Sequence, residues 1–179
     1  MTTMRCFAVL SAIGPDRTGI VSDLTEHLLK MGANVEDSRM AVLGGDFAVI
    51  LLFSAEESAL EHILAGEERL AREAGLSLLL RRTSARPEAI GPSLLWRVTA
   101  VAMDHPGIVH RLAQAVARRT INILELSSQT APAPVSGTPV FSLEMKVSVP
   151  AEHKPSVLRE ELRRLGEEEG ADVEVHPLS

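Results

Sequence analysis

The chain has 179 residues, a formal net charge of −6, 45% hydrophobic residues and 3% aromatic residues. This acidic balance disfavours direct binding to DNA or RNA, because nucleic-acid affinity depends mainly on lysine and arginine displacing condensed counterions. A single cysteine, Cys6, excludes an internal disulfide, and the sequence has neither zinc-ligand spacing nor an apolar run of about 18 residues. We therefore expect a folded cytoplasmic protein without a bound metal, a cofactor or a membrane segment.

The first 82 residues predict the order strand, helix, strand, strand, helix, strand. Residues 4–13 are apolar and strand-like, and the helix after them has its apolar face at Ile20, Leu24, Leu28 and Met31. A second strand begins at Asn34 and reaches Gly44-Gly45-Asp46, a hairpin signal, before "FAVILLF". Residues 56–74 predict one amphipathic helix with Leu60, Ile63, Leu64, Leu70 and Ala71 on one face, followed by the strand "LSLLL".

The same order then repeats. A shift of 88 positions aligns Asp16 with Asp104, Gly19 with Gly107, Ile20 with Ile108 and Asn34 with Asn122. Phe47 matches Phe141 once the second copy is given a six-residue insertion around "APAPVSGTP". The apolar helix faces of the second copy are Ile108, Leu112 and Val116, and then Val157, Leu158, Leu162 and Leu165. An internal repeat of this length indicates two domains of one design.

The order βαββαβ predicts an α+β protein of two tandem ferredoxin-like domains, each a four-stranded antiparallel sheet with two helices on one face. We expect the first domain at residues 1–82 and the second at 93–179. Residues 83–92, "TSARPEAIGP", contain two prolines and a glycine, which is typical of a linker.

The third strands of the two copies differ on one face. In the second copy, apolar residues from Phe141 to Val149 alternate with Ser142, Glu144, Lys146 and Ser148, so the face away from the helices should be wet. In the first copy the corresponding positions are Ala48, Ile50 and Leu52. An apolar outer face of this size is normally covered, so we expect the first sheet to meet either its sister domain or a second subunit.

The strand-to-helix corners at Gly19 and Gly107 have two readings. In the first, Asp16 or Thr18 caps the helix, and Pro106 starts the first turn of the equivalent helix. In the second, the free amides of the helix N-terminus receive a carboxylate or phosphate, while Asp16 accepts hydrogen bonds from an ammonium group. Amides beside a carboxylate suit a zwitterion better than a bare anion.

The motifs "DRTGIV" and "DHPGIV" at the two corners, each followed by an Asn at the start of the next strand, resemble tandem ACT domains. The stretch from Gly14 to Phe53 is similar to the first repeat of the glycine cleavage system transcriptional repressor-like family. This resemblance implies a regulatory module that binds a small molecule, usually an amino acid, near an interface between ACT units.

The resemblance implies two sets of ligand-contacting positions and a set of partners. The positions are Asp16, Arg17, Gly19, Ile20 and Asn34 in the first copy, and Asp104, His105, Gly107, Ile108 and Asn122 in the second. Arg17 and His105 occupy the variable slot of the motif and should make the two sites unequal, and Pro106 removes one backbone donor from the second. We expect an amino acid ligand, a homodimer, and a protein partner through which any effect on transcription would act.

Two other functions remain open. An acylphosphatase-like hydrolase would place a phosphate-binding loop and an Asn on this fold, but Asp16 would repel a phosphate and no nucleophile, base and orienting group converge. Cys6 lies in the first strand, where a small buried thiol is expected. The other alternative is a ligand-independent module for protein interaction or dimerisation, which the apolar sheet face would serve.

Overall fold

The computed structural model describes residues 5–84, 92–134 and 136–178, which form two compact units, Met1–Pro87 and Glu88–Ser179. The first unit contains β1 (Cys6–Pro15), α1 (Ile20–Lys30), β2 (Asn34–Leu43), β3 (Asp46–Ala55), α2 (Glu57–Ala65), α3 (Glu67–Ala74) and β4 (Ser77–Thr83). The second contains β5 (Ser93–Met103), α4 (Ile108–Ala117), β6 (Asn122–Pro132), β7 (Pro139–Pro150), α5 (Pro155–Glu169) and β8 (Ala171–Pro177). Residues 85–91 of the expected linker lie outside the described residues, so its exact limits stay a prediction.

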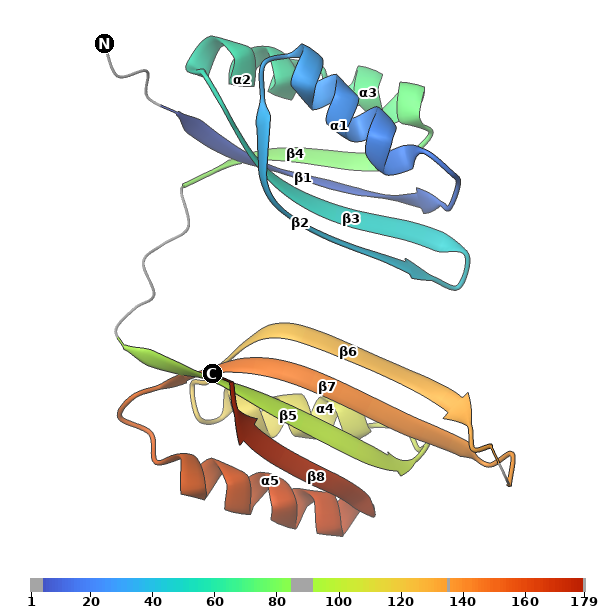
Figure 1. Cartoon of the computed structure of the whole chain (residues 1–179), viewed down its shortest axis with the longest axis vertical. Coiled ribbons are helices and arrows are strands. Elements are labelled where there is room, and N and C mark those ends of the chain that lie inside the picture. The colour runs from blue at the N-terminus through green and yellow to red at the C-terminus, as the bar shows by residue number, and fades with distance from the viewer. Residues whose placement is uncertain (1–4, 85–91, 135, 179) are drawn as a thin grey trace. The chain divides into compact units, whose positions relative to one another are not determined.

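Each unit is one four-stranded antiparallel sheet with helices over one face (Figure 1). The strand orders are β2-β3-β1-β4 and β6-β7-β5-β8, so the two units share one topology. The predicted α+β fold with two tandem ferredoxin-like domains is therefore confirmed.

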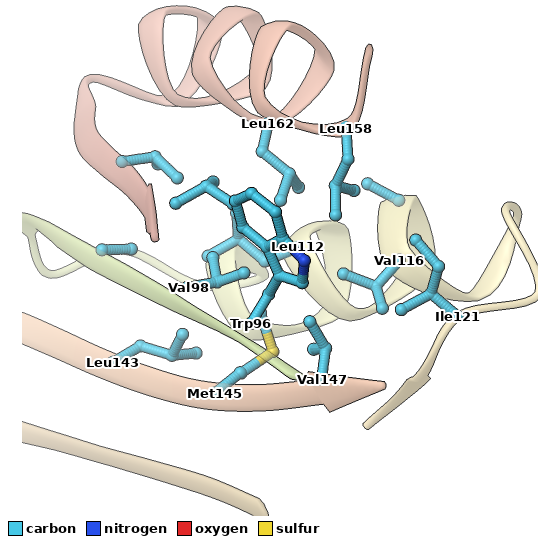
Figure 2. Close-up of a cluster of buried hydrophobic side chains, with 14 of the residues drawn as sticks. Trp96, Val98, Leu112, Val116, Ile121, Leu143, Met145, Val147, Leu158 and Leu162 are labelled. Atoms are coloured by element: carbon cyan, nitrogen blue, oxygen red, sulfur yellow. The ribbon is translucent and has the colours of Figure 1, made fainter. Parts of the chain in front are cut away.

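The core of each domain lies between its sheet and its helices. In the first domain Leu10, Leu24 and Phe53 are fully buried. In the second, Trp96 lies among the aliphatic side chains of Leu112, Met145 and Leu158 (Figure 2). The Trp96 indole N–H is buried without a partner among the described residues, while the Arg159 guanidinium lies 5.7 Å from the ring centroid. Both cores are mainly aliphatic, because the chain has so few aromatic residues.

Two helix predictions need correction. The single helix expected at residues 56–74 is two helices, because the backbone bends at Gly66, whose amide donates to His62 O and Ile63 O at the end of α2. Val157, expected on the core face of α5, is 42% exposed. It precedes the buried Leu158 by one residue, and adjacent helical residues point about 100° apart.

The two hairpins are as predicted. Gly44 and Gly45 both have positive φ, 63° and 94°, as a two-residue turn between β2 and β3 requires. The second copy has its longer loop between Pro132 and Pro139. Along β7 the apolar residues are buried and the intervening residues are half-buried or exposed, so the predicted alternation is confirmed.

The two strand-to-helix corners have the same backbone conformation. Gly19 and Gly107 stand directly before α1 and α4 with φ of 91° and 97°, in the left-handed region. A Cβ at either position would meet no atom within 4 Å, so space does not demand glycine there. Glycine is required by the backbone conformation, because an L-residue with a Cβ is strained at this φ.

We expect Gly19→Ala and Gly107→Ala each to lower the free energy of unfolding by about 1 kcal/mol, the strain of a left-handed alanine. Gly19→Asn should cost less, because asparagine tolerates this conformation. Urea denaturation of the three variants checks the order. A Gly19→Ala variant as stable as the wild type would contradict it.

A polar cluster ties α2 to the sheet at the start of β1. The Glu57 carboxylate accepts hydrogen bonds from the Arg82 guanidinium and, at 2.8 Å, from the Cys6 thiol. These bonds lower the pKa of Glu57 to about 2, with Arg82 the larger cause, and the Glu57 bond raises the pKa of the Cys6 thiol. The expectation of a buried Cys6 is therefore wrong, since the residue is half-buried at the sheet end and its Sγ reaches a carboxylate.

We expect Glu57→Gln to destabilise the protein near neutral pH and to lose this effect in acid. The folded-state pKa of about 2 lies below the ordinary value of 4.5, so the stabilisation is fully present above pH 4.5 and disappears as the pH falls toward 2. Urea denaturation at about pH 7 and about pH 3 measures it. Arg82→Gln removes the partner of Glu57, so its free energy of unfolding should also approach that of the wild type as the pH falls. A stability difference between variant and wild type that does not change with pH would refute the assignment.

Candidate functional site

Both corners are tied to the hairpin at the same end of their sheet. The Asp16 amide donates to Gly45 O at 3.0 Å, and the Asp104 amide donates to Pro139 O at 3.3 Å. The tie fixes the path of each corner loop before its helix begins. The backbone of the repeated motif is thus held in the same way twice.

The prediction that Asp16 or Thr18 caps the first helix is wrong. Gly19 is the N-cap residue of α1 and Gly107 that of α4, and neither helix start has a side-chain cap. Both corner aspartates are exposed, and among the contacts of the described residues their carboxylates make no hydrogen bond or ion pair. The corners therefore present helix amides without a side-chain cap together with an exposed carboxylate.

The isoleucines of the motif have a structural role in their side chains. Ile20 and Ile108 are both 2% exposed and pack in the cores of their domains. Of these residues only the main chain, at the first turn of α1 and α4, can contact a ligand. Glycine before each isoleucine leaves that main chain uncovered.

The residues of the variable slot fold back onto the last helix of their own domain. Arg17 pairs with Asp23 (Nη2–Oδ2 2.8 Å) and donates to Ala74 O, at the end of α3. His105 Nε2 lies 3.1 Å from Glu169 O, at the end of α5. A cationic or N–H donor group near a helix C-terminus complements the negative end of the helix dipole. Both slot residues therefore connect the corner to the C-terminal end of the last helix of their domain.

The charged side chains around the two slots differ. At the position equivalent to Asp23, the second domain has Arg111, whose Nη1 lies 2.6 Å from the Glu169 carboxylate. Glu169 is nearly buried between Arg111 and His105. The two corners therefore share a backbone but differ in the charged side chains beside it.

The two asparagines lie far from the corners of their own domains. Asn34 starts β2 opposite Ser54, whereas Gly14, near the corner, pairs with Phe47. Seven residues of β3 separate these points, about 23 Å along the strand. Asn122 is likewise opposite Ser148, at the far end of β7 from Asp104. Within one domain, a small ligand cannot contact both the corner and the asparagine.

The structure places a polar cluster around Asn34 that the sequence did not predict. Glu36 Oε1 accepts hydrogen bonds from Ser54 Oγ (2.5 Å), Asn34 Nδ2 (3.2 Å) and Arg5 Nη1 (3.5 Å). The Ser54 bond, and after it the Asn34 bond, lowers the pKa of Glu36. A pocket of about 400 Å³ beside the cluster is lined by Arg5, Gly32, Asn34, Ser54, Ala55 and Glu56.

This cluster depends on a β-bulge that the second domain also has. The register shifts between Val35 and Asp37 in the first domain and between Ile123 and Glu125 in the second. The residue inside the bulge is Glu36 in one case and the partly exposed Leu124 in the other. The matching Asn–Ser pairs were visible in the repeat, but the bulge that turns Glu36 toward Ser54 was not.

Neither corner nor cluster offers a metal site. In the part of the chain that the structure describes, no three His, Cys, Asp or Glu side chains gather around a point that could hold an ion. Across the same residues, no helix is long and apolar enough to span a membrane.

The comparisons with known proteins agree with the fold. The model of the ACT domain family matches residues 7–80 and 97–176. The glycine cleavage system transcriptional repressors of Escherichia coli and Shigella flexneri are each 37% identical over 127 residues, 71% of this chain and 66% of their own length. The match therefore spans just under two thirds of those relatives.

A solved structure shares the whole architecture. The crystal structure of an unknown protein from Galdieria sulphuraria has a TM-score of 0.81 and 30% identity, covering 98% of this chain and 100% of its own. Two family matches, one in each compact unit, agree with the two sheets of identical strand order. The chain belongs to the ACT-domain family, with one ACT domain in each half, and is related to the glycine cleavage system transcriptional repressors.

Proposed function

We propose that the protein is a non-catalytic sensor of an amino acid or a similar small zwitterion, which binds at the corner loops near an interface between ACT domains. The observation that carries the proposal is the repeated corner, where an exposed aspartate stands beside a helix start without a side-chain cap. The amides of that helix start suit the ligand's carboxylate. Asp16 or Asp104 suits its ammonium group.

The separation of corner and asparagine supports an interface site. Gly14, two residues before Asp16, and Asn34 lie about 23 Å apart along one sheet, by the rise of seven strand residues. One small ligand therefore contacts both kinds of residue only where the corner of one ACT domain meets the asparagine end of another. A ligand that bridges two domains stabilises their association by its differential affinity for the joined state.

The two corners should differ in affinity. Pro106 removes a backbone donor that Thr18 supplies in the first corner. Arg111 and His105 replace the Arg17–Asp23 pair beside the second corner. We propose the first corner as the stronger site.

A thermal-shift screen of the twenty amino acids against the full chain tests the proposal. A ligand at about 100 times its dissociation constant stabilises the fold by about 2.7 kcal/mol. We expect a shift with one amino acid or a chemically related few, and no shift with the corresponding 2-hydroxy acid, which lacks the ammonium group.

Matched variants locate the site. Asp16→Asn should abolish the shift, whereas Asp104→Asn, the same change in the second corner, should leave most of it. Asn34→Ala should weaken binding if the ligand lies between two domains. A chain that ignores every amino acid would instead favour the ligand-independent interaction module.

Catalysis has less support. Hydrogen bonding to Glu57 raises the pKa of the Cys6 thiol, which disfavours the nucleophilic thiolate. The exposed Asp16 carboxylate would repel an acyl phosphate at the corner. Measurable hydrolysis of an acyl phosphate by the purified chain would reverse this assignment.

We further propose that the protein acts in the cytoplasm through a protein partner, possessing no DNA-binding surface of its own. The relatives named above are transcriptional repressors, but the net charge here is −6. We expect no binding of duplex DNA by the chain alone, with or without the amino acid, in fluorescence anisotropy at physiological salt. Specific binding by the isolated chain would contradict this part of the proposal.

A further inference from the structure

The first domain has an apolar sheet face, opposite the helices, that no described element of the same domain covers. Val49, Leu51 and Phe53 of β3 point into the core, so the alternate residues point to the other side. There Ile13, Ile50 and Leu79 are 54%, 48% and 58% exposed. A shallow cavity of about 570 Å³ lies over them. We call this surface the open face.

The second domain shows that the fold does not require apolar residues here. In the first domain Ser11 pairs with Ile50 on one side and with Leu79 on the other. In the second domain the equivalent Thr99 pairs with Glu144 and Glu174. Glu144 also forms an ion pair with Arg97 at 3.0 Å. Two positions of this row are therefore apolar in the first domain, Ile50 and Leu79, and glutamates in the second, although Arg39 of β2 lies beside Ile50 in the first. The apolar character of these two positions serves something other than folding.

The charges at the edges of the open face are arranged to match a second copy. One row across the sheet runs from Asp37 on β2 through Leu52 and Val9 to Arg81 on β4. A two-fold axis parallel to the strands lays β2 of one copy over β4 of the other. Asp37 of each copy then faces Arg81 of the other, and both contacts form at once by symmetry. Asp37 also contacts Arg39 of its own chain at 2.5 Å, so Arg81 would add a second cation.

The size of the face suits a stable interface. Four strands at about 4.8 Å and about nine residues at about 3.3 Å give roughly 19 Å by 30 Å, or about 570 Å² per copy. As a flat area, two copies would bury roughly 1,100 Å² in total, and the uneven side-chain surface adds to this. The total is above the threshold of about 1,000 Å² for a specific interface. Facing sheets pack about 10 Å apart, a distance that apolar side chains from both faces fill.

We propose that the open face is covered by the open face of a second copy, which forms a two-fold, sheet-to-sheet homodimer. Its apolar contacts are built from Ile13, Ile50 and Leu79 of both copies, and the axis lays Arg39 of each copy opposite Leu79 of the other, where the aliphatic stem of the arginine packs on the leucine. Its rim holds two reciprocal pairs of Asp37 and Arg81. This surface lies opposite the helices and requires no amino acid ligand, so its test is independent of the sensor proposal.

The double variant Ile50→Glu/Leu79→Glu gives the second domain's residues to the first. Because glutamate occupies both positions in a domain of the same fold, we expect the variant to fold, as measured by circular dichroism and thermal unfolding. In sedimentation velocity over a wide range of concentration, the wild-type chain should be a dimer and the variant a monomer. The matched control is Leu29→Glu, which changes a side chain that is 71% exposed on α1 and should leave the dimer intact.

A charge exchange tests the geometry. Asp37→Arg should raise the dimer dissociation constant at least tenfold, and Asp37→Arg/Arg81→Asp should restore most of the affinity. A wild-type chain that stays monomeric at every concentration would overturn the proposal and leave the face to another cover, such as the sister domain or a different protein. A dimer that survives the Ile50→Glu/Leu79→Glu change would overturn it as well.

Discussion

The repeated corner depends on a backbone conformation that only glycine adopts without strain. At Gly19 and Gly107 the chain turns from a strand into a helix with φ near 90°, and the first residue of each corner loop, Asp16 or Asp104, donates its amide to the neighbouring hairpin. With glycine at the N-cap, no side chain caps the helix, and the motif's aspartate remains exposed. The same turn therefore starts the helix that covers the core and leaves polar groups at the surface.

The two domains are an internal comparison of one fold with different surface chemistry. Strand order, corner glycines and the bulge in the second strand are repeated in both domains. The charges around the corners, the residue in the bulge and the character of the outer sheet face are not repeated. On these differences rest the two proposals that place the stronger ligand site and the assembly surface in the first domain.

Ligand binding and assembly are separate in this picture. The corners lie at one end of each sheet, the asparagines at the other, and the open face lies opposite the helices. A dimer formed through the open face would leave corners and asparagines accessible for further contacts between ACT domains. In such a dimer, ligand binding at the corners would change the contacts between ACT domains, while the dimer itself would form without the ligand.

The sequence by itself determined the elements and their order. Helical spacing, the Gly-Gly hairpin and the duplicated motif are local signals, and from them followed the two ferredoxin-like domains; the alternation along the third strand placed Ile50 on the outer sheet face. It erred where local signals compete: Gly66 divides one predicted helix in two, and the glycine N-caps exclude the predicted caps at Asp16 and Thr18. Only the tertiary structure decided that Asn34 lies far from Asp16, that a bulge turns Glu36 toward Ser54, and that Arg17 and His105 reach the last helix of their domains. Those arrangements depend on strand register and on contacts between residues distant in the chain, which no local pattern encodes.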